Sequence, residues 1–465
     1  MNDQSVSLND VHSALNPTIV KRLVAPRSAE ELPACLADAS REGLKIIASG
    51  GRHAMGGQQF VSDGVVLDLR GLNKIKHFDS KKGLLRVEAG IQWPELISEY
   101  LKLQEGEPEQ WGITQKQTGA DTITLGGSLA VNAHGRGLTF APIIQDVEEF
   151  TLLKADGQSA VCSRIQNAEL FSLAIGGYGL FGVIIDVTLR LSRRQKLERV
   201  VEIATADTLE EKFKQRIAAG FLYDDFQFAI NESSTDFLRK GVFSCYRPTD
   251  LPVADTLPRE LEEQSWLQLL YLAYTDRQAV YEKYSAYYLS TSGQVYWSDT
   301  HQLSPYLPDY AARLRNMGGN GAPSSLMITE LYVPLKDLNS FLNEAATTLQ
   351  RLGATVIYGT VRLIEEDTES FLPWAKQSYA CIIFNLLVDH SPTGKEKAAV
   401  AFRALIDLAL AHDGNYFLTY HRFATREQME RGYPAFGRFM EAKSKYDPHA
   451  LFESDWYLHY SGLWQ

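Results

Sequence analysis

The sequence predicts an α+β protein of two domains, and three observations support this class. A chain of 465 residues is long enough for two or three domains with a large core. Up to about residue 193, strand-like and helix-like stretches alternate without the regular β-α-β repeat of a parallel sheet. Residues 326–420 follow the order β-α-β-β-α-β, which is the ferredoxin-like order. We therefore expect a first domain over 17–193, a second over 194–425, and a final segment, 426–465, that returns to the first.

The first domain is predicted from short apolar runs that are separated by turn residues. Its expected elements are, in order, a helix over 29–44, a strand at 45–48, a strand and a helix over 84–103, a hairpin over 147–163, and a helix and a long strand over 171–191. Pro94 stands in the first turn of its helix, where a missing N–H costs nothing. Asp156 and Gly157 are typical of the tight turn of a hairpin.

The second domain shows its pattern most clearly after residue 326. Its expected elements are a strand at 326–333, a helix over 337–352, strands over 354–363 and 379–389, a helix over 395–412, and a last strand at 415–420. Tyr420 and His421 lie at the end of this last strand. Because neighbouring residues of a strand point to opposite faces, only one of the two side chains can face a common site.

Tyrosines crowd the helix-like segment 263–290. Those near one face are Tyr271, Tyr274, Tyr281, Tyr284 and Tyr288. Two interpretations stay open: the rings pack in the core or in a subunit contact, as in a homodimer, or they form a surface that faces a ligand.

Composition and charge exclude several classes of protein. A hydrophobic content of 45% with 22% charged residues is ordinary for a soluble globular chain. We find neither a signal-like start nor a run of about 18 apolar residues, so we expect no cleaved signal and no membrane span. A net charge of −11 argues against nucleic acid as a partner. The scattered cysteines, Cys35, Cys162, Cys245 and Cys381, predict free thiols in a reducing compartment, and we expect a cytoplasmic protein.

Three glycine-bearing stretches are the main functional signal. They are ASGGRHAMGGQQF (48–60), TLGGSLAVNAHGRG (124–137) and GGYGLFGVI (176–184). None fits GxGxxG with its later acid, and none is GxxxxGK[ST]. Glycines let backbone N–H groups approach a phosphate, but they also mark ordinary turns, so each stretch alone is a weak signal.

Taken together and in this order, the three stretches resemble the FAD-linked oxidases of the vanillyl-alcohol-oxidase type, which carry a PCMH-type FAD-binding domain. Gly50–Ala54 is similar to the loop of cytokinin dehydrogenases and sugar-lactone oxidases that closes over the FAD pyrophosphate. His134 and Gly135 are similar to a turn of the aldonolactone and decaprenylphosphoryl-ribose oxidases, and 433–455 is similar to the closing segment of the same enzymes. The resemblance is weakest over 200–320.

The resemblance implies FAD as the cofactor and a set of residues that hold it. These are Gly50, Gly51, Arg52, His53, Ala54, Gln58, Thr124, Gly127, Ala130, His134, Gly135 and Ile184. His53 takes the position of the histidine that those families join to the flavin 8α-methyl, so the resemblance implies a covalent 8α-histidyl FAD. His134 is expected to be a structural or flavin-packing residue rather than a base.

Departures from these families leave the catalytic residues open. The resemblance implies Arg362, Tyr420, His421 and Asp121 as candidates, without a metal. Thr360-Val361-Arg362 keeps the arginine of the lactone and alditol oxidases but loses their carboxylate. Arg362 either forms a surface ion pair with Glu365 or Glu366 or lies over the flavin–substrate site. Tyr420 takes the position of a catalytic lysine, and the adjacent His421 is the better base by its ordinary pKa.

The expected function is the oxidation of a CH–OH group of a sugar, polyol, lactone or related alcohol, with hydride transfer to flavin N5. The base removes the hydroxyl proton, and a positive group stabilises the reduced flavin. O₂ or another carrier accepts the electrons. Two alternatives stay open, namely CH–NH oxidation on the same scaffold and a flavin-binding subunit that transfers electrons to a partner.

Overall fold

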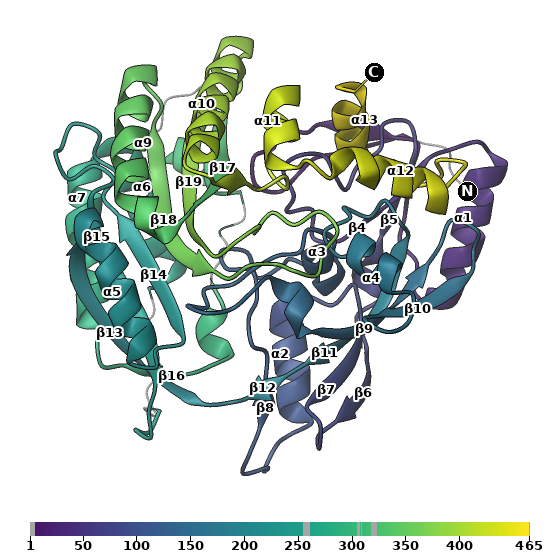
Figure 1. Ribbon diagram of the computed structural model, residues 1–465, viewed down its shortest axis with the longest axis horizontal. Helices are drawn as coiled ribbons and strands as arrows, with labels where there is room; N and C mark the ends of the chain where they lie inside the picture. The colour runs from purple at the N-terminus through teal and green to yellow at the C-terminus, as the bar shows by residue number, and fades with distance from the viewer. Residues whose placement is uncertain (1–4, 254–260, 305–306, 308, 318–322, 465) are drawn as a thin grey trace.

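Two α+β parts make up the structure, and the C-terminal segment packs back on the first of them (Figure 1). The computed structural model describes residues 5–253, 261–304, 307, 309–317 and 323–464. Both parts combine helices with sheets, so the predicted α+β class is confirmed. No helix of the described residues is both long and apolar enough to cross a membrane.

The first part contains a parallel sheet and a larger antiparallel one. The parallel sheet has the order β3 (Arg22–Val24), β5 (Val65–Asp68), β4 (Ile46–Ser49), and the antiparallel sheet has the order β10 (Ser159–Ser163), β9 (Val147–Leu153), β11 (Val183–Arg190), β7 (Leu84–Glu88), β6 (Ile75–Asp79). Two short pairs, β1 (Val6–Leu8) with β2 (Thr18–Val20) and β8 (Trp111–Gly112) with β12 (Ser192–Arg193), and the helices α1 (Leu32–Arg41), α2 (Trp93–Lys102), α3 (Leu125–Ala130) and α4 (Ala168–Ala174) complete it. The predicted hairpin is present as β9–β10, with Leu153 opposite Ser159.

The second part is one antiparallel sheet of eight described strands. Their order is β16 (Val295–Trp297), β13 (Lys196–Thr205), β15 (Lys240–Pro248), β14 (Tyr223–Phe228), β18 (Val356–Ile364), β19 (Tyr379–Asp389), β17 (Ser324–Val333), β20 (Asn415–Tyr416). Its helices are α5 (Ala206–Ala218), α6 (Glu263–Thr275), α7 (Arg277–Ser290), α8 (Tyr310–Asn316), α9 (Leu338–Leu352) and α10 (Pro392–Ala411).

This sheet contains the same β-α-β-β-α-β order twice. The predicted unit is formed by β17, α9, β18, β19, α10 and β20, and an earlier unit by β13, α5, β14, β15, α6–α7 and β16. In each unit the fourth strand pairs with the first and the third lies between the first and the second. The units join edge to edge where Phe226 of β14 pairs with Val361 of β18. The sequence did not reveal this repeat.

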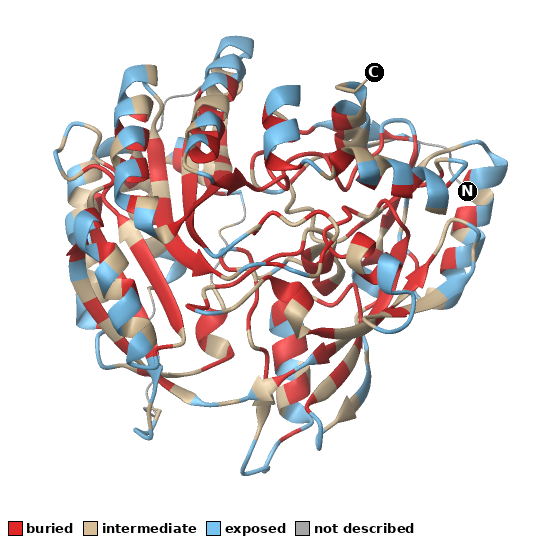
Figure 2. Ribbon diagram, in the orientation of Figure 1, coloured by how far each residue is buried: buried red, intermediate tan, exposed pale blue. Residues whose placement is uncertain are grey.

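Helices cover both faces of the large sheet. Val242 of β15 clusters with Tyr284 of α7, whereas its neighbour Phe243 lies 5.0 Å, centroid to centroid, from Phe213 of α5. Since successive side chains of a strand alternate, α7 and α5 lie on opposite faces. Figure 2 shows the strands buried between these layers and the outer helix surfaces exposed. The face under α6 and α7 is the one that turns toward the first part.

The spacing of its apolar residues explains why α9 forms, and a glycine explains where it ends. The side chains that it buries recur at helical spacing and are Leu338, Phe341, Leu342, Ala345, Ala346 and Leu349. The helix ends at Gly353, whose φ of +63° suits glycine in a left-handed C-terminal cap.

The last predicted strand, 415–420, is wrong beyond residue 416. The structure keeps only two residues, β20, in the sheet. The carbonyl of Leu418 accepts from Gln58 Nε2 at 2.8 Å, and that of Thr419 accepts from the N–H of Met55 at 3.0 Å. Since these carbonyls bind the first part rather than β17, the chain leaves the sheet here. Strand alternation therefore does not govern Tyr420 and His421.

The tyrosine-rich segment forms two helices rather than one. The break falls at Asp276, whose side chain accepts from the N–H of Ala279 at 3.0 Å and caps α7. Tyr284 packs against Val201 and Val242 in the core.

The C-terminal segment, with α11 (Arg426–Gly432), α12 (Phe436–Tyr446) and α13 (Asp455–Gly462), reaches β4. Phe452 forms a parallel bridge with Ile46. Before this bridge, Lys443 Nζ lies 2.6 Å from Asp447 Oδ2, and only 2% and 1% of these two side chains are exposed. Asp447 also accepts from the N–H groups of Leu451 and Phe452, so it holds the turn that leads into the bridge.

We expect Lys443→Met to destabilise the fold by about 3–5 kcal/mol, because it leaves a buried carboxylate without its counter-ion. The control is Lys445→Met, since this lysine forms a surface pair with Glu169 and 58% of its side chain is exposed. It should cost about 1 kcal/mol or less. Urea denaturation measures both, and equal losses would contradict a special role for the buried pair.

Candidate functional site

A cavity of about 1030 Å³ lies between the first part and the large sheet. Its lining comes from the glycine-rich loop after β4, from residues 117–133 around α3, from the start of β11, and from β13 to β19 of the sheet. Pockets for small molecules fall in the range of about 300–1,000 Å³, so this cavity is large enough for a bulky ligand together with a second, smaller one.

The glycine-rich loop owes its path to close backbone contact. A Cβ on Gly50 would lie 2.0 Å from Thr124 Oγ1, and one on Gly51 would lie 2.2 Å from the carbonyl of Thr122. Arg52, with φ of +59°, adopts the left-handed region that favours glycine. The loop thus lies directly on the segment that starts α3, and both border the cavity.

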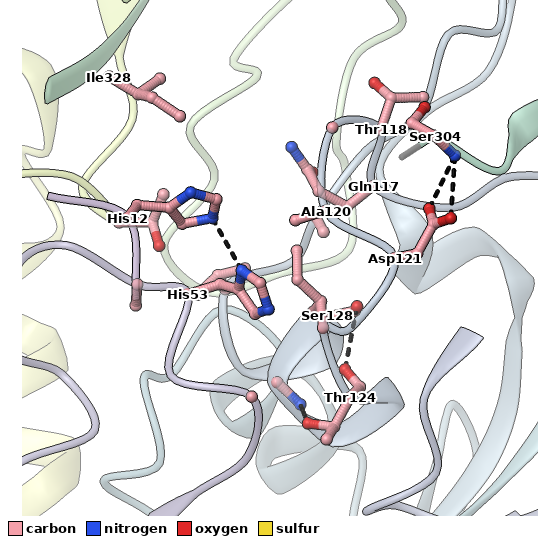
Figure 3. Close-up of a pocket in the computed structure, with 18 of the residues that line it drawn as sticks. His12, His53, Gln117, Thr118, Ala120, Asp121, Thr124, Ser128, Ser304 and Ile328 are labelled. Carbon is pink, nitrogen blue, oxygen red and sulfur yellow. Dashed lines mark hydrogen bonds between the residues drawn. The ribbon is translucent and has the colours of Figure 1, made fainter. Parts of the chain in front are cut away.

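His53 lies on the cavity wall beside a second histidine, as Figure 3 shows. Its Nδ1 is 2.8 Å from His12 Nε2, and its Nε2 is 2.8 Å from Thr122 Oγ1. Burial lowers the pKa of His12 to about 4 and that of His53 to about 3. Both imidazoles are therefore neutral at pH 7. No local pattern indicates His12, because tertiary folding alone brings the N-terminal segment to this loop.

Most of the other residues predicted to hold the cofactor also line the cavity. These are Gly50, Gly51, Arg52, Ala54, Gln58, Thr124, Gly127, Ala130 and Ile184. His134 and Gly135 do not line it. His134 is buried behind the wall, where its Nε2 lies 2.6 Å from Glu330 Oε1.

Arg362 faces the cavity from β18 and is buried, so the alternative of a surface ion pair with Glu365 or Glu366 is wrong. Its Nε lies 3.4 Å from Asp225 Oδ1, and its Nη1 donates to Thr118 Oγ1. Asp225 also accepts from the hydroxyl of Thr360. Arg362 is thus a fixed positive charge in the wall, with one carboxylate beside it.

Tyr420 lines the cavity, and its hydroxyl donates to Glu330 Oε2 at 2.8 Å. Glu330 also accepts from Tyr332 at 2.5 Å. Burial alone would raise the pKa of Glu330, but His134 and the two tyrosine hydroxyls lower it to about 2. Burial and the Glu330 charge raise the pKa of Tyr420 well above its ordinary value.

Sequence analysis missed Glu330, although a carboxylate inside the apolar run LMITELYV was a usable signal. Cys381 completes the cluster, since its Sγ lies 3.3 Å from Glu330 Oε1. Its thiol stays protonated, because burial raises its pKa well above the ordinary value. His134, Glu330 and Cys381 could offer ligand atoms to a metal, but these atoms already contact one another through hydrogen bonds, so we assign no metal to the cluster.

His421 points away from the cavity. Its Nε2 lies 3.1 Å from Ser13 Oγ, and its ring stacks on Phe423 with centroids 5.2 Å apart. Burial lowers its pKa to about 4. Of the two neighbours considered as a base, the structure places only Tyr420 in the cavity wall.

Asp121 lines the cavity but is already engaged. Its Oδ1 forms a 2.7 Å ion pair with the buried Lys116, and both of its oxygens accept from the N–H of Ser304 (Figure 3). The Asp121 carboxylate thus links the first part of the structure to Ser304 of the second part at the cavity wall.

Unmet hydrogen-bonding groups indicate a polar ligand. The buried polar atoms of the cavity lining that have no hydrogen-bond partner within the described residues are Ser49 Oγ, Gln59 Oε1, Gln117 Oε1, Arg136 Nε and His301 Nε2. Leaving such an atom unpaired costs about 1–3 kcal/mol. They lie in both halves of the cavity, so a long polar molecule or two ligands fit this donor and acceptor set.

Comparison with known proteins agrees with this geometry. Residues 20–163 match a family described as "FAD binding domain". The chain is 27% identical over 265 residues to an uncharacterised oxidoreductase of the fasciation locus of Rhodococcoides fascians, covering 56% of each chain. It is 31% identical over 182 residues to cytokinin dehydrogenase 3 of Oryza sativa subsp. japonica (38% of this chain, 33% of the relative). It is 30% identical over 166 residues to L-gulonolactone oxidase of Mus musculus (36% of each).

The matched regions thus span about half of these relatives' length, or less. The family match falls on a domain whose glycine-rich loop and α3 border the cavity. Residues 20–163 are an FAD-binding domain, and through this domain the chain is similar to the FAD-linked oxidoreductases of the vanillyl-alcohol-oxidase type.

Proposed function

We propose that the protein oxidises a CH–OH group of a small alcohol, with FAD as the hydride acceptor. The observation that carries this proposal is the continuity of the cavity from the FAD-binding domain to Arg362 and Tyr420 on the sheet side. A cofactor and its substrate can then meet in one space.

The residues that would hold FAD belong to the first part. The loop around Gly50 and Gly51, residues 124–130 of α3, and Ile184 offer backbone N–H groups and a close-packed wall. Ser49 Oγ and Gln59 Oε1 add buried polar atoms that lack a partner among the residues that the structure describes. Bound FAD would supply the two-electron acceptor that no side chain of the protein can provide.

Tyr420 is suited to take the hydroxyl proton of the substrate. Because its own proton is donated to Glu330, its oxygen presents lone pairs to the cavity. As hydride leaves the substrate carbon the hydroxyl becomes strongly acidic, so its proton can move to Tyr420 Oη as the proton of Tyr420 moves to Glu330, in spite of the low pKa of that carboxylate. Glu330 is thus the final proton acceptor, and His134, on its far side, is a positioning residue.

Arg362 would stabilise negative charge that develops during the reaction. A guanidinium is always protonated and cannot itself act as a base. Its place in the wall is held by Asp225 and Thr118, so it needs no reorganisation when charge appears.

The proposed reaction is tested by mixing the FAD-loaded protein with alcohols and with matched amines in the absence of O₂. Alcohols should bleach the flavin absorbance, since Tyr420 and Glu330 provide a route for the hydroxyl proton. Bleaching by amines alone would establish CH–NH oxidation instead. If neither class bleaches a flavin that dithionite does reduce, the protein is an electron-transfer subunit. Readmitting O₂ shows whether O₂ or another carrier reoxidises it.

Tyr420→Phe should slow anaerobic flavin reduction by about 10²–10⁴-fold, because it removes the group that receives the proton. His421→Asn is the matched control, since His421 is the adjacent residue but lies outside the cavity lining. It should reduce the flavin at nearly the wild-type rate. Stopped-flow absorbance measures both variants, and the reverse result would make His421 the base.

We further propose that His53 forms an 8α-histidyl bond with FAD. The new N–C bond would replace the N–H of His53 and one C–H of the flavin 8α-methyl, and the two electrons released would pass to O₂ or another carrier. Its neutral imidazole is the nucleophilic form, and it borders the cavity. Bond formation through Nδ1 would displace the contact with His12, and through Nε2 the contact with Thr122.

Acid precipitation should then leave the yellow colour in the protein pellet, and the intact mass should exceed the chain mass by one FAD. His53→Ala should release its flavin into the acid supernatant. His77→Ala, at an exposed histidine of β6, should keep the flavin bound. Complete release from the wild-type protein would refute the bond but not FAD binding.

A further inference from the structure

We infer that the sheet side of the cavity is built to bind an anionic group of the substrate, so that the substrate is an alcohol that also carries a carboxylate or a phosphate. This inference rests on the proposed function and specifies its substrate class. Arg199 and Arg136 carry it. Arg199 lies outside the stretches that indicate FAD, and Arg136 lies at the end of the stretch 124–137 but is not among the residues predicted to hold the cofactor.

Arg199 is a buried cation of β13 that points into the cavity and is 7% exposed. Its Nε donates to Ser244 Oγ at 2.9 Å. Its guanidinium lies 4.3 Å from the ring centre of Tyr288 and 5.5 Å from that of Tyr246. All three neighbours are neutral, so the charge of Arg199 is packed but not balanced.

Arg136 approaches the same ring from the first part. Its guanidinium lies 5.8 Å from the centre of Tyr246, and its Nη2 donates to the carbonyl of His301 at 2.9 Å. Its Nε is buried and has no partner within the described residues. Two cations from different parts of the chain thus converge on Tyr246.

The carboxylates that line the cavity do not balance these charges. Within the described residues they are Asp121 and Asp225, and each has another cation, Lys116 and Arg362 respectively. A buried charge is costly unless it is paired. Elsewhere in the chain the rule is met, as in the pair of Arg194 with the buried Asp299 at 2.9 Å. Asp224 is also buried near Arg136, but burial and the charge of Asp225 raise its pKa well above the ordinary value, so it is neutral. A ligand anion is therefore the counter-charge that Arg136 and Arg199 lack within the described residues.

His301 supplies a second feature of the ligand. Its Nδ1 lies 3.3 Å from the carbonyl of Trp297, which can only accept, so Nδ1 carries the proton. Burial and the charge of Arg136 lower the pKa of His301 well below its ordinary value, so the ring is neutral. Its buried Nε2, which lacks a partner among the described residues, is therefore an acceptor that suits a ligand hydroxyl.

The surrounding rings favour a flat or apolar body. Tyr246, Tyr288, Tyr296, Trp266 and Trp297 all line this end of the cavity. An anion held by two arginines, a hydroxyl at His301 and aromatic walls together describe a hydroxy acid or a phosphate ester of an alcohol.

The test measures binding of three unreactive probes to the FAD-loaded protein by titration calorimetry. The probes are benzoate, phenyl phosphate and the neutral benzamide, which has the shape of benzoate. At least one of the two anions should bind about tenfold or more tightly than benzamide, since hydrogen bonds to charged groups contribute about 1.5–3 kcal/mol. The tighter anion identifies a carboxylate or a phosphate as the recognised group. Anions that bind no better than benzamide would overturn the inference.

Variants assign the effect to these two arginines. Arg199→Met should abolish the preference for the anion, and Arg136→Met, at a half-buried position that tolerates change better, should reduce it about tenfold. The matched control is Arg216→Met, because Arg216 also lies over a ring, 4.7 Å from the centre of Phe221. It belongs to α5, on the opposite face of the sheet, and pairs with Glu202 of β13. The assignment of anion binding to Arg136 and Arg199 would be contradicted if the preference for the anion over benzamide survived in both cavity variants, or if it were lost in the Arg216→Met control. Because the probes are not oxidised, this result is independent of the flavin-bleaching test of the proposed function.

Discussion

The structure depends on one buried carboxylate, that of Glu330. It lies 1% exposed on β17, and burying such a charge is costly unless hydrogen bonds and an opposite charge surround it. Its partners come from three places, namely His134 of the FAD-binding domain, Tyr332 of its own strand and Tyr420 of the segment after β20. Satisfying this group therefore fixes the sheet against the FAD-binding domain and sets Tyr420 at the cavity wall in the same step.

The same junction explains how the chain shapes the cavity. The carbonyls of Leu418 and Thr419 leave the sheet to accept from Gln58 and Met55 of the glycine-rich loop. The loop in turn lies on Thr122 and Thr124, where only glycine fits at positions 50 and 51. Cofactor loop, α3 and the Tyr420 segment are thus one connected structure, and a change in any of them is transmitted to the others through backbone contacts.

Local sequence signals were enough for much of this architecture. The period of α9, the hairpin at Asp156–Gly157 and the glycine-rich stretches depend on neighbours in the chain, and each was found. Arg362 was also found, through the resemblance of Thr360-Val361-Arg362 to a strand of the lactone and alditol oxidases. Arg199 could not be found in this way, since a charged residue within a strand usually faces solvent, and neither could Arg136, which lies in the irregular segment after α3. Only tertiary folding shows that these two charges face a cavity. Glu330 did leave a local signal, a carboxylate inside an apolar run. The first β-α-β-β-α-β unit was missed because its second helical segment is divided at Asp276 into α6 and α7. These two helices also lie on the face of the sheet opposite to α5, so this unit does not keep both helical segments on one face.

The central claim is that this cavity holds FAD between a binding domain and a substrate-binding sheet. Its most direct test is the visible absorbance of the purified protein, with the flavin quantified per chain after proteolysis of the denatured protein. The account predicts the two-band spectrum of oxidised flavin and one FAD per chain, either as purified or after incubation with added FAD. A folded protein that is colourless and that takes up no FAD would contradict it.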